Sequence, residues 1–322
     1  MNAIDSKNRT NMPHTHFHRT ILFAVFCAAG LGVFWGPLRE LAAYSFGDEL
    51  YTHFCLIPPV SAYFIFLKRK SIFAEAEYAR AGGAIVAVAG IVLLVTGLHY
   101  KTDLGQNDYL SLGAAGMVLW VIGGFIGVYG TRAFRRALFP MLFLFFTVPI
   151  PTLVLDRFVG FLQHLSADAV EGVLTFIGTP HVRSGSVFEL PGHTIDVAPQ
   201  CSGIRSTLAL VILATVGGYV FLDTGWRRLL LVLAVIPVSV FKNALRISTL
   251  GLLASYVDPR WITDSWLHRA GGKPFFIIAL VMLTPILWML VRSERKEKKK
   301  NGTKMDNAIG IIGVENKRVE TT

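Results

Sequence analysis

The sequence predicts an all-α polytopic membrane protein with about eight transmembrane helices, an outer interfacial helix and a short β-hairpin. Of its 322 residues, 53% are hydrophobic and only 16% are charged. The apolar residues form continuous runs, several of which approach the ~20 residues that cross a hydrocarbon layer. A soluble protein of this length would not need such runs.

The apolar runs define a membrane domain over residues 20–291, with a polar tail before it at 1–19 and a basic, polar tail after it at 292–322. A signal-peptide cleavage site has a small-x-small pattern at the end of the apolar run. Here the first such pattern, Ala28-Ala29-Gly30, lies in the interior of the run, which favours a signal anchor over a cleaved signal peptide. The helices are expected at 20–37, 53–67, 81–98, 109–129, 137–155, 203–222, 229–256 and 275–291.

The distribution of Lys and Arg predicts the orientation, because these residues in short loops stay on the cytoplasmic side. With the N-terminus inside, the inner segments hold 18 of them and the outer segments 7. The protein is therefore expected in the cytoplasmic (inner) membrane, with both termini on its cytoplasmic side. The net charge of +10 then reflects topology and attraction to anionic membrane lipids. A nucleic-acid partner is not expected, since no basic stripe carries interleaved aromatic residues.

Residues 156–200 form the one extended outer segment. Within it, residues 158–177 carry apolar side chains at helical spacing and polar ones elsewhere, which predicts a helix lying in or re-entering the outer interface. In residues 183–198, apolar and polar residues alternate on both sides of the Pro191-Gly192 turn, a pattern typical of a hairpin. This hairpin would deliver the chain to Cys201 from outside.

Cys201 is the candidate nucleophile. It lies at the N-terminal boundary of the sixth predicted helix, where free N–H groups and the helix dipole favour a thiolate. Cys27 falls in the middle of a span and is expected to be a small apolar residue. Cys55 has no cation beside it. Three cysteines leave at least one outside any intramolecular disulfide.

The seventh helix carries three polar residues that are costly in a membrane: Lys242, Asn243 and Arg246. Starting near Leu229, a rise of ~1.5 Å per residue puts Arg246 near the outer boundary, with Lys242 one turn below it. The two cations could instead snorkel to the outer headgroups. Asn243 is too short to snorkel, which favours a polar site.

His268 lies in the next outer loop, before Gly271-Gly272. A single loop histidine is usually only solvated. A thiol, a guanidinium and an imidazole at one membrane face are, however, the parts of a nucleophilic acyl-transfer site.

These residues resemble the pattern of the exosortase/archaeosortase family of membrane cysteine transpeptidases. The pattern comprises a Cys-Ser-Gly-hydrophobic-Arg-Ser element, an Asn-x-x-Arg-Ile element and a His before the last helix. Here these are residues 201–206, residues 243–247 and His268. Because many archaeal members have Arg at the last position, His268 indicates the bacterial exosortase branch.

The resemblance implies cleavage of a C-terminal sorting signal of exported proteins, of the PEP-CTERM type: a short Pro-containing motif, a transmembrane helix and a basic tail. Cys201 would form a thioester, Arg246 would stabilise the oxyanion and His268 would act as acid and base. A lipid or glycan acceptor, or water, would release the product. Ser202, Arg205, Lys242 and Asn243 are expected to support the site or bind substrate.

Neither a cofactor nor a metal is expected; the alternation of His14, His16 and His18 lies on a solvated tail. Two non-catalytic alternatives remain, a membrane transporter and an envelope polysaccharide assembly protein. The sequence shows no repeat with paired broken helices of the kind that marks transporters. An assembly protein would leave the polar residues of the seventh helix unexplained.

Overall fold

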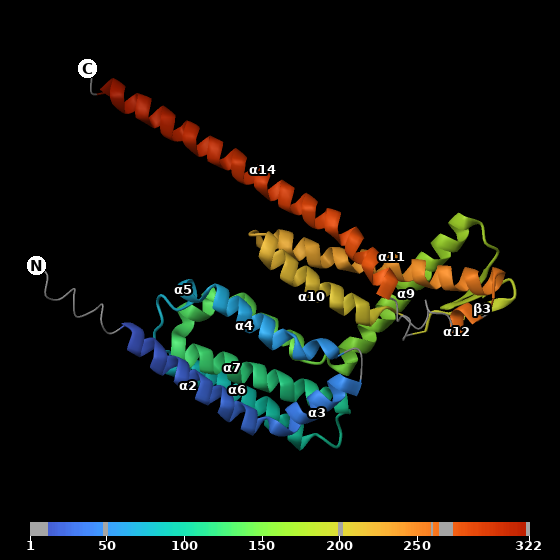
Figure 1. Ribbon diagram of the computed structural model, residues 1–322, viewed down its shortest axis with the longest axis horizontal. Coiled ribbons are helices and arrows are strands. Elements are labelled where there is room, and N and C mark those ends of the chain that lie inside the picture. Colours follow the sequence, from blue (N-terminus) through green and yellow to red (C-terminus); the bar gives the residue numbers. More distant parts are fainter. Residues whose placement is uncertain (1–11, 48–50, 199–201, 259, 264–272, 320–322) are drawn as a thin grey trace, which may run out of the picture. The chain divides into compact units, whose positions relative to one another are not determined.

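The computed structural model describes residues 12–47, 51–198, 202–258, 260–263 and 273–319, most of them helical (Figure 1). The chain divides into two compact units, Met1–Arg157 and Phe158–Thr322. Their boundary falls inside one helix, α9 (Thr152–Ile177). Each unit is described separately.

Within the described ranges, five helices are long and apolar enough to cross a membrane. Two further pairs of helices, bent by 74° and 87°, raise the number to seven if each pair is one span. The multi-pass membrane protein predicted from the sequence is thus confirmed, but the count of eight is not. The five long helices are α6, α7, α10, α11 and the first part of α14.

Unit 1 consists of helices packed around the long helix α7, which is buried along much of its length (Figure 1). Helices α2, α3 and α6 contact it directly, and α4 contacts α8. The predicted span at 53–67 is a 3-10 turn followed by only 11 helical residues, about 17 Å, which is short of a ~30 Å hydrocarbon layer. The elements are α2 (Met12–Val33), α3 (Trp35–Gly47), η1 (Thr52–Cys55), α4 (Ile57–Leu67), α5 (Arg69–Ile72), α6 (Arg80–His99), α7 (Gln106–Arg136), α8 (Leu138–Phe143) and η2 (Leu144–Thr147).

Glycines let the backbones of α6 and α7 touch. A Cβ atom added to Gly83 would lie 2.4 Å from the backbone N of Gly127, and one added to Gly90 would lie 2.4 Å from the carbonyl oxygen of Gly116. Small residues at such positions are the usual means of close packing between membrane helices, where apolar side chains alone give no preference over lipid. The α6–α7 pair is therefore held by close van der Waals packing of the two backbones.

The prediction of one helix over 137–155 is wrong, because the chain breaks between η2 and α9. Pro149 and Pro151 lack N–H donors and restrict the residues before them. The backbone groups released by the break find side chains of α7: Ser111 donates to the carbonyl of Pro149 at 2.8 Å, and Asn107 to that of Ile150 at 2.7 Å. The N–H of Thr152 donates to Asp108 at 2.6 Å, so the first N–H of α9 also has a partner.

In its described residues, unit 2 combines five helices of very different length, counting the part of α9 after Arg157, with a small antiparallel sheet (Figure 1). The helix predicted at 158–177 and the hairpin around Pro191-Gly192 are confirmed. A third strand, β1, was not predicted, and neither was the helical continuation of α14 through the C-terminal tail. Besides α9, the elements are β1 (Val182–Ser184), β2 (Val187–Leu190), β3 (His193–Asp196), α10 (Ile204–Phe221), α11 (Gly225–Tyr256), α12 (Arg260–Thr263) and α14 (Lys273–Val319).

The sheet lies with one face on α9 and α11. Phe188 and Val197 from the sheet are completely buried in a cluster with Val170 of α9 and Ala244 of α11. Arg183 of β1 pairs with Phe188 across the sheet and binds two carboxylates of α9, Asp168 at 2.7 Å and Glu171 at 2.5 Å. These hydrogen bonds raise the pKa of Arg183 above its ordinary value. The sheet is thus held on α9 both by apolar burial and by ion pairs.

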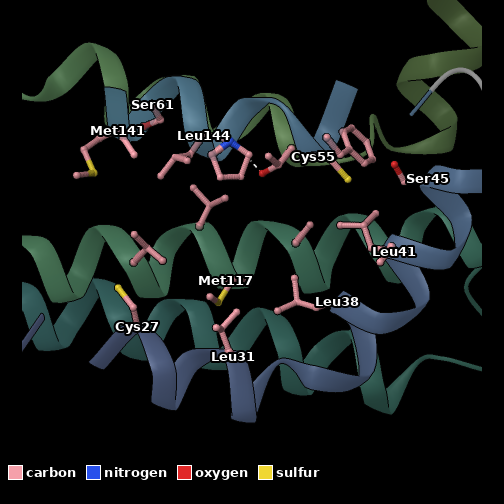
Figure 2. Close-up of a pocket in the computed structure, with 18 of the residues that line it drawn as sticks. Cys27, Leu31, Leu38, Leu41, Ser45, Cys55, Ser61, Met117, Met141 and Leu144 are labelled. Atoms are coloured by element: carbon pink, nitrogen blue, oxygen red, sulfur yellow. Dashed lines mark hydrogen bonds between the residues drawn. The ribbon is translucent and has the colours of Figure 1, made fainter. Parts of the chain in front are cut away.

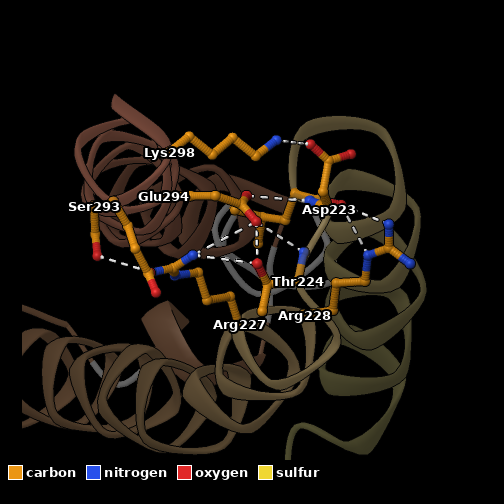
Figure 3. Close-up of polar contacts among 9 residues, drawn as sticks. Asp223, Thr224, Arg227, Arg228, Ser293, Glu294 and Lys298 are labelled. Atoms are coloured by element: carbon orange, nitrogen blue, oxygen red, sulfur yellow. Dashed lines mark hydrogen bonds and ion pairs between the residues drawn. The ribbon is translucent and has the colours of Figure 1, made fainter. Parts of the chain in front are cut away.

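A polar cluster joins α14 to the turn between α10 and α11 (Figure 3). Glu294 accepts hydrogen bonds from the backbone N–H of Asp223 at 3.1 Å and of Thr224 at 2.8 Å, and its carboxylate lies 3.5 Å from Arg227. Lys298 pairs with Asp223. Arg227 and Glu294 are almost fully buried. Since a buried charge needs a partner, this cluster fixes α14 against the turn.

We predict that Gly83→Ala lowers the free energy of unfolding by at least about 1–3 kcal/mol, the usual cost of overpacking, because its Cβ atom would meet backbone atoms of α7. Gly82→Ala is the matched control on the same helix. Gly82 is exposed, and the nearest atom to an added Cβ lies 3.9 Å away. SDS titration of the purified protein measures both changes. Equal effects of the two substitutions would contradict close backbone packing.

Candidate active site

The polar residues of α11 lie on its buried side. Lys242 is 3% exposed and Asn243 is completely buried, whereas Arg246 is half-buried. Lys242 and Arg246 are four residues apart and therefore share one face of the helix. Burial of Lys242 rules out snorkelling for this side chain, which was the alternative explanation from the sequence.

Lys242 reaches the first turn of α10. Its ammonium donates a hydrogen bond to the hydroxyl of Ser206, and that hydroxyl donates to the carbonyl oxygen of Gly203 at 2.9 Å. The N–H of Thr207 donates to the same carbonyl at 2.9 Å. The buried cation thus stabilises the turn that leads into α10, immediately after Ser202.

Gly203 has a left-handed conformation with φ of 78°, which residues with a side chain rarely adopt. A Cβ atom at this position would lie 3.1 Å from Oδ1 of Asn243. The Nδ2 group of Asn243 donates to the hydroxyl of Ser166 on α9 at 3.1 Å. Asn243 therefore packs against the Gly203 turn and holds α9 at the same point of α11.

Arg246 differs from Lys242 and Asn243 in having no partner among the described residues. Throughout the described chain, its guanidinium forms no hydrogen bond or ion pair, and its Nε atom is buried. The hydroxyl of Ser202 is also buried without a hydrogen bond in that part of the chain. A charged donor and a hydroxyl left unsatisfied in a buried place indicate a site for a polar ligand.

Two of the three predicted catalytic residues, Cys201 and His268, lie outside the described residues. The chain on either side of Cys201 is described: β3 ends at Asp196 and α10 begins at Ile204. Arg205 is exposed and so lies on a different face of α10 from Ser206. The structure therefore brings together Ser202, Lys242 and Asn243 around the Gly203 turn, and does not place Arg205 among them.

Comparison with known protein families decides the assignment. Residues 40–285 match the family described as transmembrane exosortase. The chain belongs to the transmembrane exosortase family. Exosortases are generally cysteine transpeptidases, and they act on exported proteins with C-terminal signals. No curated protein and no solved structure matches the chain.

Two contacts of this exosortase were not predicted from its sequence, those of Ser166 and Ser206. Ser166 lies one turn from Leu162 and one turn from Val170 on the buried face of α9. A small polar residue inside an apolar helical face was the only signal for it. Ser206 stood in the sequence motif, but nothing in the motif indicated a bond to Lys242.

Unit 1 of the exosortase contains an apolar cavity of about 440 Å³ (Figure 2). Its hydroxyl groups all bond to backbone carbonyls: Ser45 to Tyr51 at 2.8 Å, Ser61 to Pro140 at 2.6 Å and Thr147 to Leu144 at 2.6 Å. The cavity thus offers no free hydroxyl for chemistry. Cys27 and Cys55 line it as free thiols, and for Cys27 this fits the small apolar residue expected there.

We predict that Ser166 and Asn243 are energetically coupled. In a double-mutant cycle of Ser166→Ala and Asn243→Ala, the coupling energy should fall in the range of about 0.5–3 kcal/mol that is typical of contacting residues. Ser248 provides the control, since it is buried on α11 but has no hydrogen-bond partner in the described chain. The control cycle of Ser166→Ala and Ser248→Ala should be additive. SDS titration gives the unfolding energies, and an additive Ser166–Asn243 cycle would disprove the contact.

Proposed function

We propose that this exosortase cleaves the C-terminal sorting signal of exported proteins through a thioester on Cys201. The observation that carries the proposal is the guanidinium of Arg246, which has no partner among the described residues and lies half-buried in a membrane helix one turn from a buried lysine. A purely structural arginine in this environment would be expected to have a partner. The family match supplies the reaction class.

In the proposed first step, the Cys201 thiolate attacks a carbonyl carbon of the sorting motif. A sulfur–carbon bond forms, the peptide carbon–nitrogen bond breaks, and the leaving amine takes a proton from His268. Arg246 donates hydrogen bonds to the oxyanion that develops in the transition state. The product is a thioester between Cys201 and the exported protein.

In the second step, an amine or hydroxyl of a lipid or cell-surface glycan attacks the thioester. His268 takes the proton of this acceptor, and the Cys201 thiolate is released. Water in place of the acceptor would make the reaction a proteolysis. Neither step requires a cofactor.

The local structure supports a reactive thiol at this position. Cys201 precedes the Gly203 turn by two residues, and α10 follows this turn with 18 residues. The N-terminus of such a helix carries free N–H groups and the positive end of the helix dipole, which lower the pKa of a nearby thiol. Lys242 adds a positive charge that is fixed to the same turn.

We further propose that the site faces the outside of the cytoplasmic (inner) membrane and that both termini lie inside. Arg227 and Arg246 stand 19 residues apart on α11, or about 28 Å along a helix, close to the ~30 Å of a hydrocarbon layer. The polar cluster around Arg227 would then lie at the inner face and Arg246 at the outer one. The excess of Lys and Arg in the predicted inner segments supports this orientation.

The nucleophile can be tested by trapping. We predict that an exported reporter ending in a Pro-containing motif, a transmembrane helix and a basic tail forms a covalent adduct with the wild-type protein. Cys201→Ala should form no adduct and leave the reporter uncleaved, while remaining folded in the membrane. Mass spectrometry of the purified protein measures the adduct.

Cys27→Ala and Cys55→Ala are the matched controls, because both thiols are free and line the apolar cavity of unit 1. Both variants should cleave the reporter normally. Cleavage by the Cys201→Ala variant would refute the assignment of the nucleophile. A transporter or an assembly protein would give no adduct with any of the four proteins.

We predict that Arg246→Lys lowers the rate of reporter cleavage by on the order of 10²-fold or more, the cost of losing one well-placed donor to an oxyanion. Lysine keeps the charge but lacks the planar set of donors. Arg205→Lys should have a milder effect, since Arg205 is exposed. The ratio of processed to unprocessed reporter in cells gives both results. A fully active Arg246→Lys protein would leave Arg246 only an anchoring role.

A further inference from the structure

β3 forms one edge of the three-stranded sheet, whose order is β1-β2-β3. Its register on β2 pairs Phe188 with Ile195, and beyond the strand the N–H of Val197 donates to the carbonyl of Ser186 at 3.0 Å. In an antiparallel pair, bonded and non-bonded positions alternate. Counting back from Val197, the residues that bond to β2 are Ile195 and His193.

The two residues between them, Thr194 and Asp196, direct their backbone N–H and C=O groups away from β2. Within the described chain, no hydrogen bond reaches these backbone groups. Both side chains are exposed as well. An open strand edge of this kind is a template for another extended chain, and proteins normally cover or blunt it.

The edge is held rigidly even though it is open. Ile195 packs against Gly251 of α11, where a Cβ atom would lie only 2.0 Å from the isoleucine side chain. At the end of the strand, Gln163 of α9 donates to the carbonyl of Val197 at 2.7 Å. The edge therefore keeps its shape without a partner, which reduces the entropy that a binding peptide must overcome.

Only a short length of chain separates the edge from the proposed nucleophile. Asp196 precedes Cys201 by five residues, and an extended chain advances at most about 3.3–3.6 Å per residue. The two Cα atoms are therefore no more than roughly 18 Å apart, the length of about five extended substrate residues.

We propose that the open edge of β3 binds the sorting motif of the substrate as an additional strand and leads its scissile bond to Cys201. The inference rests on the proposed function and adds the way in which the substrate is held. N–H and C=O groups that repeat every second residue, roughly 7 Å apart, match an extended polypeptide. A lipid or a glycan has no such repeat.

This mode of binding constrains the substrate. Only every second residue of an added strand would bond to β3, so a proline, which has no N–H, is tolerated at the residues between. A short motif that contains proline therefore fits an added strand if the proline occupies a position facing away from β3.

The test removes the two outward N–H groups one at a time. Thr194→Pro and Asp196→Pro each delete one outward donor and leave the backbone bonds to β2 in place, although Asp196→Pro also removes the carboxylate that accepts a hydrogen bond from Ser186 at 3.1 Å. Each should lower the cleavage of the reporter by about 10-fold, the value of one hydrogen bond. The matched control is His181→Pro. His181 immediately precedes β1, the opposite edge strand, and within the described chain its N–H donates no hydrogen bond, so this variant should cleave the reporter at the wild-type rate.

Labelling of Cys201 with iodoacetamide separates substrate binding from the nucleophile. Thr194→Pro and Asp196→Pro should label at the wild-type rate, because the small electrophile does not need the strand edge. Normal cleavage of the reporter by either variant would overturn the proposal. So would an equal loss in His181→Pro. Failure of the proposed function gives a different result, namely cleavage by Cys201→Ala.

A second measurement avoids the risk that a proline variant misfolds. In the Cys201→Ala protein, amide hydrogen exchange at Thr194 and Asp196 should be fast alone and slow by at least about 10-fold when the reporter is bound. Ile195, already bonded to β2, should show little change. Unchanged exchange at Thr194 and Asp196 with bound reporter would overturn the proposal.

Discussion

A cation and an amide that are buried in a membrane helix must find partners there, and this constraint organises unit 2. Lys242 and Asn243 are consecutive on α11 and therefore point about 100° apart. The first bonds to Ser206 of α10 and the second to Ser166 of α9. Two adjacent residues thus connect three helices at one level. Arg246, one turn further along, has no such partner within the described residues.

The need of buried polar groups for hydrogen-bond partners also explains how unit 1 tolerates a broken helix. Once prolines interrupt the run after η2, several backbone carbonyls lose their helical partners. Asn107 and Ser111, one turn apart on α7, bond to two of these carbonyls, and Asp108 accepts the first N–H of α9. Irregular backbone at membrane depth is stable where it is buried in protein and satisfied in this way. The polar residues at the start of α7 are therefore part of the fold of unit 1.

Hydropathy predicted α6, α7, α10 and α11 well, because a long apolar run with few charges has few other stable states. It failed over 137–155, since an apolar run does not reveal whether a neighbouring helix can satisfy a break. Charge within a span singled out Lys242 and Arg246. Their surroundings could not be predicted, because a serine such as Ser166 is common in membrane helices and its pairing depends on the tertiary fold. The presence of Cys201 and His268 in the site stays a prediction from the sequence.

The left-handed turn at Gly203 has a consequence at the level of the gene. Every amino acid that a single nucleotide change can put in place of glycine carries a Cβ atom. Most of these residues cost about 1–2 kcal/mol in this conformation, and the added atom would press on Asn243. Aspartate, which tolerates the conformation best among them, would bring its carboxylate against the amide oxygen. The codon for Gly203 thus has no neighbouring codon for another residue that preserves the turn unstrained.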